Sequence, residues 1–298
     1  MDVVSADGTR LHVQQYGPVD GEPILLIHGF SCAIEYWNPQ ISAFAERYRV
    51  IAFDQRGHGG SGRFRGPLTA SHLADDLSAV LAATVTSGQR ATIVGHSMGG
   101  VTTLAWAAKY PDEVATRVKA ALLADTAASL VNHRLNLLDS PDFLTRLQAR
   151  ALDAVLRTRL PFPALKWNRG LVRKLGLSEF ATPEAVDFVQ DITAQCPPDV
   201  RLRWANGARQ IDVSNGVAAL SVPTTVLYGA LDGMLAPSIT KLLADQVRAA
   251  GNLLREVELP KSGHATNLED IDTFNAEIVA LLTSSDAANR MKAKRFRR

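Results

Sequence analysis

One short stretch of the chain carries the residues best suited to covalent chemistry. Ala91 to Val94 is an apolar run, and it leads directly into Gly95-His96-Ser97-Met98-Gly99-Gly100 and then into helix-forming residues. A Gly-x-Ser-x-Gly motif between a strand and a helix is typical of a nucleophile elbow, in which a strained turn projects the serine hydroxyl. The flanking glycines are needed because side chains there would collide where strand and helix pack. Ser97 is therefore a predicted nucleophile, and the strand-to-helix context disfavours the alternative of an ordinary glycine-rich turn.

A serine hydroxyl is a weak nucleophile until a neighbouring base accepts its proton. His264 is the candidate base, because imidazole titrates near neutral pH and this residue follows Gly263 and the last predicted strand. A carboxylate must also hold that imidazole in one tautomer and stabilise the imidazolium. Asp125 directly follows one predicted strand and Asp232 lies just past another, so both are candidates for this carboxylate.

These residues lie in a regular alternation of strand and helix patterns. Residues 3–16 alternate around Asp7-Gly8, a dipeptide that favours a hairpin turn, and predict two antiparallel strands. Short apolar runs predict buried strands at residues 24–27, 49–53, 91–94, 120–124, 224–228 and 254–259. Helical spacing predicts helices at residues 36–47, 70–84 and 238–250, and a last helix that carries Ile271, Phe274, Ile278 and Leu281. This alternation predicts a parallel sheet with helices on both faces.

The alternation breaks between residues 128 and 220. No β-rich run occurs there, apolar residues at 143–155 have helical spacing, and prolines punctuate the rest. We therefore predict a helical cap at residues 128–220, inserted into a core domain formed by residues 1–127 and 221–283. Residues 284–298 are polar and basic, and we predict a disordered tail.

A glycine-rich loop at residues 54–62 could suggest phosphate binding. Its glycines at 57, 59, 60 and 62 fit neither Gly-x-x-x-x-Gly-Lys nor a Gly-x-Gly-x-x-Gly that opens a helix. The loop is therefore predicted to be structural.

Composition excludes several classes of protein. A chain of 298 residues with 46% hydrophobic content predicts one large globular domain with an insertion, and no apolar run approaches the length of a membrane span. The N-terminal residues do not resemble a signal peptide, and Cys32 and Cys196 have no metal-ligand spacing. We expect a cytoplasmic protein without a metal or cofactor. The basic segments lack the interleaved aromatics of nucleic-acid modules, so no nucleic-acid partner is expected.

Taken together, the motifs make the sequence similar to the α/β-hydrolase superfamily. The matching features follow successive strands: His28-Gly29-Phe30, Asp54-Gln55-Arg56-Gly57-His58-Gly59, Gly95-His96-Ser97-Met98-Gly99-Gly100, Gly229-x-x-Asp232 and Gly263-His264. The chain most resembles the capped branch that contains esterases, lipases and non-haem haloperoxidases. The resemblance implies an α/β-hydrolase fold with an eight-stranded, mostly parallel sheet, flanking helices and a helical cap.

The resemblance also implies a role for each polar residue. This fold uses the chain order Ser…Asp…His, which implies Asp232 as the acid and His264 as the base. Asp125 remains an alternative, because some branches place the acid there. His28 and His58 are expected to bond to loop backbone, and His96 to be a packed neighbour. His12, His72 and His133 also come too early in the chain to be the base.

A serine nucleophile needs two fixed N–H donors for the oxyanion that forms on the attacked carbonyl. The residue after the nucleophile supplies one, so Met98 is predicted to donate, helped by the N-terminus of the following helix. The resemblance implies the backbone N–H of Phe30 as the other.

These inferences predict a serine hydrolase that cleaves a small carboxylic ester through an acyl-enzyme intermediate, as esterases and lipases do. Alternatives with the same triad are C–C bond hydrolysis, perhydrolysis, acyl transfer, or a ligand-binding receptor with low turnover. The substrate is expected to be apolar and to bind under the cap. Aromatic residues of the insertion either line that pocket or form the cap's own core: Phe143, Phe162, Trp167, Phe180, Phe188 and Trp204.

Two segments are strongly basic although the net charge is only +2. Residues 146–174 hold eight Lys or Arg and one acid, and residues 284–298 hold six Lys or Arg and one acid. Because the first segment also contains many apolar residues, it predicts weak contact with an anionic membrane surface. The alternative is a solvated face of the cap and a solubilising tail.

Overall fold

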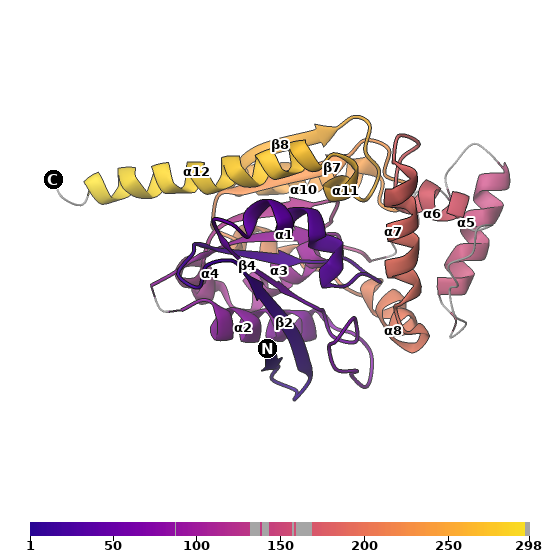
Figure 1. The fold of residues 1–298 in the computed structure, drawn as a ribbon, viewed down its shortest axis with the longest axis horizontal. Coiled ribbons are helices and arrows are strands. Elements are labelled where there is room, and N and C mark those ends of the chain that lie inside the picture. Colours follow the sequence, from indigo (N-terminus) through magenta and orange to yellow (C-terminus); the bar gives the residue numbers. More distant parts are fainter. Residues whose placement is uncertain (87, 132–137, 139–142, 157, 159–168, 296–298) are drawn as a thin grey trace.

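A single mixed sheet forms the centre of the protein in the computed structural model (Figure 1), which describes all residues except 87, 132–137, 139–142, 157, 159–168 and 296–298. The sheet has eight strands in the order β1-β2-β4-β3-β5-β6-β7-β8. The strands are β1 (Asp2–Val4), β2 (Arg10–Tyr16), β3 (Pro23–Ile27), β4 (Arg49–Phe53), β5 (Ala91–His96), β6 (Val118–Ala124), β7 (Thr224–Gly229) and β8 (Leu253–Leu259). β2 pairs antiparallel with β1 and β4, and all the other pairs are parallel. The predicted eight-stranded, mostly parallel sheet is confirmed.

Helices cover both faces of the sheet because its central strands are apolar on both sides. In β3, Leu25 and Ile27 face the core that includes α2 (Ala70–Thr84), α3 (Met98–Lys109) and α10 (Pro237–Ala249). Ile24 and Leu26 face the opposite core, which includes α1 (Asn38–Phe44) and the first part of α12 (Ile271–Arg295). The period-2 alternation of a fully buried strand thus builds two cores, one on each face.

The predicted helices agree with the structure except near the first one. Instead of one helix over residues 36–47, a 3₁₀ turn, η1 (Ile34–Trp37), precedes α1. Pro39 lies in the first turn of α1, where its missing N–H and fixed φ are tolerated, so the α-helix begins there. A further short helix, α4 (Pro111–Arg117), follows α3 and also begins at a proline.

The described part of the insertion is helical. It contains α5 (Phe143–Leu156), α6 (Arg169–Gly176), α7 (Pro183–Ala194) and α8 (Pro198–Ala208), which lie at the end of the molecule opposite the C-terminus (Figure 1). Backbone hydrogen bonds join residues 128–130 to residues 211–213, Leu130 N to Ile211 O and Val213 N to Ala128 O. These bonds form the neck through which the chain enters and leaves the cap.

The core domain resumes earlier than residue 221. Val213, Val217 and Leu220 belong to the core on the α3 side, and α9 (Asn215–Ala219) packs against α3. A Cβ added at Gly216 would lie 2.0 Å from the carbonyl oxygen of Leu104, so the two helices are in backbone contact. The cap therefore lies between the neck segments rather than reaching residue 220.

The C-terminal segment also differs from the prediction. α12 continues to Arg295 and leaves the body of the molecule (Figure 1), so residues 284–295 are helical rather than disordered. Their composition explains the helix, because alanine, methionine, lysine and arginine all have high helix propensity.

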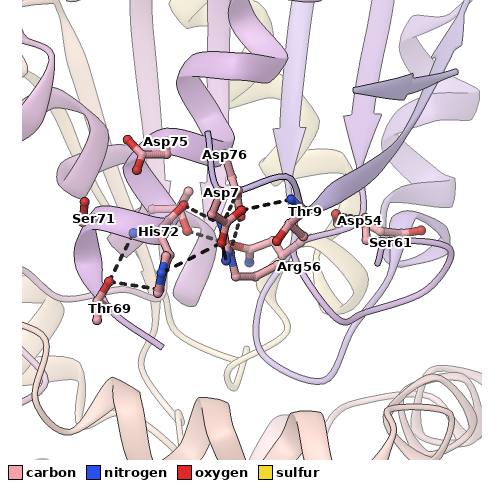
Figure 2. Close-up of polar contacts among 12 residues, drawn as sticks. Asp7, Thr9, Asp54, Arg56, Ser61, Thr69, Ser71, His72, Asp75 and Asp76 are labelled. Atoms are coloured by element: carbon pink, nitrogen blue, oxygen red, sulfur yellow. Dashed lines mark hydrogen bonds and ion pairs between the residues drawn. The ribbon is translucent and has the colours of Figure 1, made fainter. Parts of the chain in front are cut away.

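A buried arginine fixes the loop that follows β4 (Figure 2). The side chain of Arg56 is fully buried, and its Nε and Nη2 donate to both carboxylate oxygens of Asp76 in α2, at 2.7 and 2.6 Å. Nη1 donates to Asp7 in the β1–β2 hairpin at 2.8 Å. In the same loop, Asp54 accepts the backbone N–H groups of Ile34 and Gly60, at 2.8 Å each. Asp54 thus occupies one N–H group of the loop itself and joins the loop to the turn at Ile34, which supports a structural role for the loop.

Candidate active site

Ser97 lies in a strained turn between β5 and α3. The backbone φ of Ser97 is 52°, a positive value that residues other than glycine rarely adopt. A Cβ at Gly99 would lie 2.0 Å from the carbonyl oxygen of Ile27, and one at Gly95 would lie 2.7 Å from that of Gly99. Only glycine therefore fits at these two positions. The strain projects the Ser97 hydroxyl above the end of the sheet.

The structure brings Ser97, His264 and Asp232 together from three separate loops. Nε2 of His264 lies 3.0 Å from Oγ of Ser97, and Nδ1 of His264 lies 2.6 Å from Oδ2 of Asp232. His264 follows β8 and Asp232 follows β7, and both side chains are buried. Oδ1 of Asp232 accepts the backbone N–H groups of Met234 and Leu235, at 2.8 Å each. These two bonds fix the carboxylate, so only Oδ2 is directed at the imidazole.

The surroundings of His264 favour its protonated form. Burial by itself would lower the pKa of His264, but the nearby carboxylates together outweigh burial and raise this pKa, with Asp232 contributing most and Asp125 and Glu269 less. Since Asp232 accepts from Nδ1–H, the neutral imidazole carries its proton there and presents Nε2 as an acceptor to Ser97. This is the geometry that the predicted roles of Ser97, His264 and Asp232 require.

Asp125 does not contact His264 directly. It follows β6, and its carboxylate accepts the N–H of Gly229 at 3.0 Å and the hydroxyl of Thr266 at 2.6 Å. Complete burial raises the pKa of Asp125 well above its usual value. Of the two candidate carboxylates, Asp232 is the one within hydrogen-bond distance of the imidazole.

Two backbone N–H groups, one shortly after β3 and one at the start of α3, have no acceptor in the described part of the chain. Among the described residues, neither the N–H of Phe30 nor that of Met98 donates to another protein group. Met98 is the first residue of α3, where backbone N–H groups have no intrahelical partner. These are the two donors expected for the oxyanion.

The direction of the Phe30 N–H is set by its neighbours. Nε2 of His28 accepts the N–H of Gln55 at 3.0 Å, so Nδ1 carries the ring proton and donates to the carbonyl of Gly29 at 2.7 Å. Burial lowers the pKa of His28 to about 4, which keeps this ring neutral. The Gly29 carbonyl and the Phe30 N–H share one trans peptide plane and point in opposite directions. Holding the carbonyl therefore aims the N–H.

Gln55 connects the preceding peptide, between His28 and Gly29, to the elbow helix α3. Its side-chain amide donates to the carbonyl of His28 at 2.6 Å, and its amide oxygen accepts the hydroxyl of Thr102 in α3 at 2.7 Å. Gln55 was not among the residues singled out from the sequence. Its place in the Asp54–Gly59 motif was the available signal, but a glutamine there does not reveal which backbone atoms it contacts.

The other histidines have structural partners. His58 accepts the N–H of Ser31 at 3.1 Å, as expected for a residue that bonds to loop backbone. His96 donates from Nε2 to the carbonyl of His264 at 2.6 Å, so this elbow residue also holds the loop that carries the candidate base. His12 and His72 contact side chains outside this site, and His133 lies outside the described residues.

The aromatic residues expected under the cap do not share one environment. Trp204 is buried, and its indole N–H donates to the carbonyl of Arg56, whereas Phe188 is partly buried. Phe143 and Phe180 are exposed, so neither belongs to a buried core of the cap. Phe162 and Trp167 lie outside the described residues, as does much of the basic segment 146–174. A separate hollow of about 270 Å³, lined in part by Gly66, Asp199 and Arg203, contains none of the three site residues.

Other chemistry can be assessed for the described residues only. The two cysteines are free and buried, and burial raises the pKa of Cys196 to about 11, so its thiol is protonated at neutral pH. The described ranges bring together no group of three or more His, Cys, Asp or Glu side chains that could hold a metal ion. No helix in this part of the chain is long and apolar enough to cross a membrane.

Comparison with known proteins identifies the family. Residues 22–271 match the family model described as alpha/beta hydrolase fold. The chain belongs to the α/β-hydrolase family. A bifunctional esterase/perhydrolase, DCH, of Acinetobacter calcoaceticus is 33% identical over 95% of this chain and 99% of that protein. A protein of Variovorax paradoxus with the provisional name carbamate hydrolase RutD is 31% identical over 93% of this chain and 97% of that protein.

A solved structure agrees with this assignment. A thermophilic esterase from Thermogutta terrifontis, determined with malate bound, matches with a TM-score of 0.74 and 27% identity, covering 96% of this chain and 98% of that one. The α/β-hydrolase family is a family of enzymes, and the match extends over nearly the full length of both chains.

Proposed function

We propose that this α/β hydrolase cleaves carboxylic esters through an acyl-enzyme formed on Ser97, with His264 as general base and acid and Asp232 as its orienting carboxylate. The observation that carries the proposal is the pair of contacts at His264, 3.0 Å to Ser97 Oγ and 2.6 Å to Asp232 Oδ2. The names of the similar proteins, an esterase/perhydrolase and a carbamate hydrolase, describe attack at an acyl carbon that carries a leaving group. That common chemistry supports the same reaction class here.

In the first half of the reaction, Oγ of Ser97 attacks the ester carbonyl while its proton passes to Nε2 of His264. The carbonyl oxygen becomes an oxyanion and accepts the N–H groups of Phe30 and Met98. When the carbon–oxygen bond to the leaving alcohol breaks, His264 returns the proton to that alcohol. The acyl group remains on Ser97.

In the second half, water takes the place of the alcohol. His264 removes a proton from the water as it attacks the acyl carbon, and the same two N–H groups hold the second oxyanion. Collapse of this intermediate breaks the bond to Oγ, and His264 returns its proton to Ser97. The products are a carboxylic acid and an alcohol.

The proposal is tested by labelling and turnover together. A fluorophosphonate should label the wild-type protein at Ser97, and p-nitrophenyl esters should be hydrolysed over many turnovers, because the reagent and the substrates need the same activated hydroxyl. In Ser97→Ala the labelling should vanish and the rate should fall by roughly 10⁴-fold or more, with the fold intact, because alanine fits the elbow.

Two results would contradict this proposal. A folded Ser97→Ala variant that keeps more than a tenth of wild-type turnover would remove Ser97 from the mechanism. Labelling without steady-state turnover of any ester would favour a binding protein that retains the three residues.

A further inference from the structure

A carboxylate outside the three site residues joins the cap to the loop that carries His264. Glu269 belongs to the short helix α11 (Thr266–Glu269), which begins two residues after His264. Its Oε2 accepts the backbone N–H of Ser178 at 2.7 Å, and its Oε1 accepts the backbone N–H of Gly263 at 2.8 Å. Ser178 lies in the cap just after α6, and Gly263 directly precedes His264. The Glu269 side chain thus binds both the cap and the loop that carries His264.

The two backbones also pack directly on each other. A Cβ added at Gly263 would lie 2.4 Å from the carbonyl carbon of Leu177, so no side chain at residue 263 could separate them. Leu177 is almost completely buried. On the opposite side of the same cap segment, Nε of Arg173 donates to the carbonyl of Ser178 at 3.1 Å. The Ser178 residue is therefore held at its N–H by Glu269 and at its carbonyl by the cap itself.

We propose that Glu269 is a positioning residue that couples the cap to the His264 loop, so that the seating of the cap also sets the distance between His264 and Ser97. This inference rests on the proposed function, because it assigns a consequence to the position of His264. A charged carboxylate that accepts one N–H from each unit makes the two bonds stronger than neutral ones and ties them to a single rigid group. A displacement of the cap at Ser178 is therefore transmitted through Glu269 to Gly263, the residue before His264.

The perturbation is Glu269→Gln, which keeps the shape of the side chain. A carboxamide has only one oxygen, so its NH₂ group would face one of the two N–H donors and one of the bonds would be lost. The matched control is Glu184→Gln, the same charge change at an exposed position in the cap helix α7. Active-site titration with a fluorophosphonate gives the concentration of competent enzyme, so that kcat and KM refer to folded protein only.

We expect two kinetic changes in Glu269→Gln and neither of them in Glu184→Gln. For p-nitrophenyl acetate, kcat per titrated site should fall by about 10- to 100-fold, since a base displaced by a fraction of an ångström transfers protons poorly. For p-nitrophenyl hexanoate, KM should rise more than for the acetate, because the longer acyl chain depends on the cap. A residue with a structural role alone would lower Tm and the titratable fraction, and leave kcat and KM per site unchanged. That result would overturn the inference.

Amide hydrogen exchange tests the coupling without relying on catalysis or on a well-folded variant. In the wild-type protein, the amide protons of Ser178 and Gly263 should exchange at the same protection level, because both depend on one carboxylate. Independent exchange, with Ser178 unprotected and Gly263 protected, would overturn the inference. Failure of the proposed function is a different result: the wild type and Glu184→Gln would then show neither labelling nor turnover.

Discussion

Replacing Asp232 by asparagine tests the proposed mechanism most sharply, because the structure dictates how the new side chain must sit. Oδ1 of Asp232 accepts two backbone N–H groups, those of Met234 and Leu235, while Oδ2 accepts Nδ1–H of His264. An asparagine keeps its oxygen on the two backbone donors, because the opposite orientation would set its NH₂ group against both of them. The NH₂ group then faces His264.

The expected loss follows from this contact. Two donors cannot face each other at 2.6 Å, so the imidazole moves its proton from Nδ1 to Nε2. The nitrogen beside Ser97 then carries a proton and cannot accept another. Loss of the correct tautomer in a Ser–His–Asp triad costs roughly 10⁴-fold in kcat. That factor corresponds to about 5.4 kcal/mol of transition-state stabilisation at 1.36 kcal/mol for each tenfold.

The pH dependence should change as well as the rate. The Asp232 carboxylate raises the pKa of His264 against the effect of burial. The general base must be neutral to act, so the acidic limb of the kcat/KM profile reports that pKa. The substituted asparagine carries no charge, so burial lowers the pKa of His264 against only the smaller contributions of Asp125 and Glu269. The rate of Asp232→Asn should therefore be lower at every pH, while its acidic limb moves to lower pH.

The assay is kcat/KM for p-nitrophenyl acetate on both sides of neutral pH, with Asp125→Asn as the matched control. An asparagine in place of Asp125 keeps one oxygen for the N–H of Gly229, and its NH₂ group can donate to the Thr266 hydroxyl, which is also an acceptor. The control should lose less than about tenfold in rate, with most of its effect on stability. If Asp125→Asn lost more activity than Asp232→Asn, the reasoning would be refuted and the acid would be Asp125.

Two further predictions need simpler measurements: the stability that the Arg56–Asp7 contact contributes, and the preference for an apolar acyl group in the substrate. Although burial opposes it, the hydrogen bond from Arg56 lowers the pKa of Asp7 below 3.8, so this contact contributes stability above that pH and loses it as the pH falls. Asp7→Asn should therefore lower Tm at neutral pH, and the difference should close in acid; a constant difference would contradict the assignment. For the substrate, butyl or hexyl esters should be cleaved faster than a very short charged ester, because an acyl pocket under a cap needs apolar lining. The reverse preference would count against an apolar substrate.

Much of the fold and site could be predicted because the signals are local. Each site residue follows a buried apolar run, and the carboxyl ends of parallel strands meet at one edge of a sheet. Ser97, Asp232 and His264 therefore had to lie near one another once the strands were recognised. The chain order favoured Asp232, but the distances of Asp125 and Asp232 from the imidazole could not be predicted, because both residues follow strands that are neighbours in the sheet.

The contacts that position the site could not be predicted, because their partners are backbone groups. Glu269 binds the N–H of Ser178, 91 residues away, and any residue except proline would supply that donor. A pattern of side-chain types carries no record of such a contact. The exposure of Phe143 and Phe180 could not be predicted either. Residue type does not distinguish them from buried aromatic residues such as Trp204, because tertiary packing decides which side chains face the interior.

β6 contributes none of the three proposed catalytic side chains, yet the residues at its end contact all three loops. Ala124 accepts the N–H of Ser97 at 2.8 Å, and the Thr126 hydroxyl donates to the carbonyl of Ser97 at 2.7 Å. Between them, Asp125 holds Gly229 at the start of the Asp232 loop and Thr266 just after His264. Asp125 adopts a strained φ of 48°, which these bonds maintain. The end of one central strand therefore contacts the three different loops that carry the proposed nucleophile, base and acid.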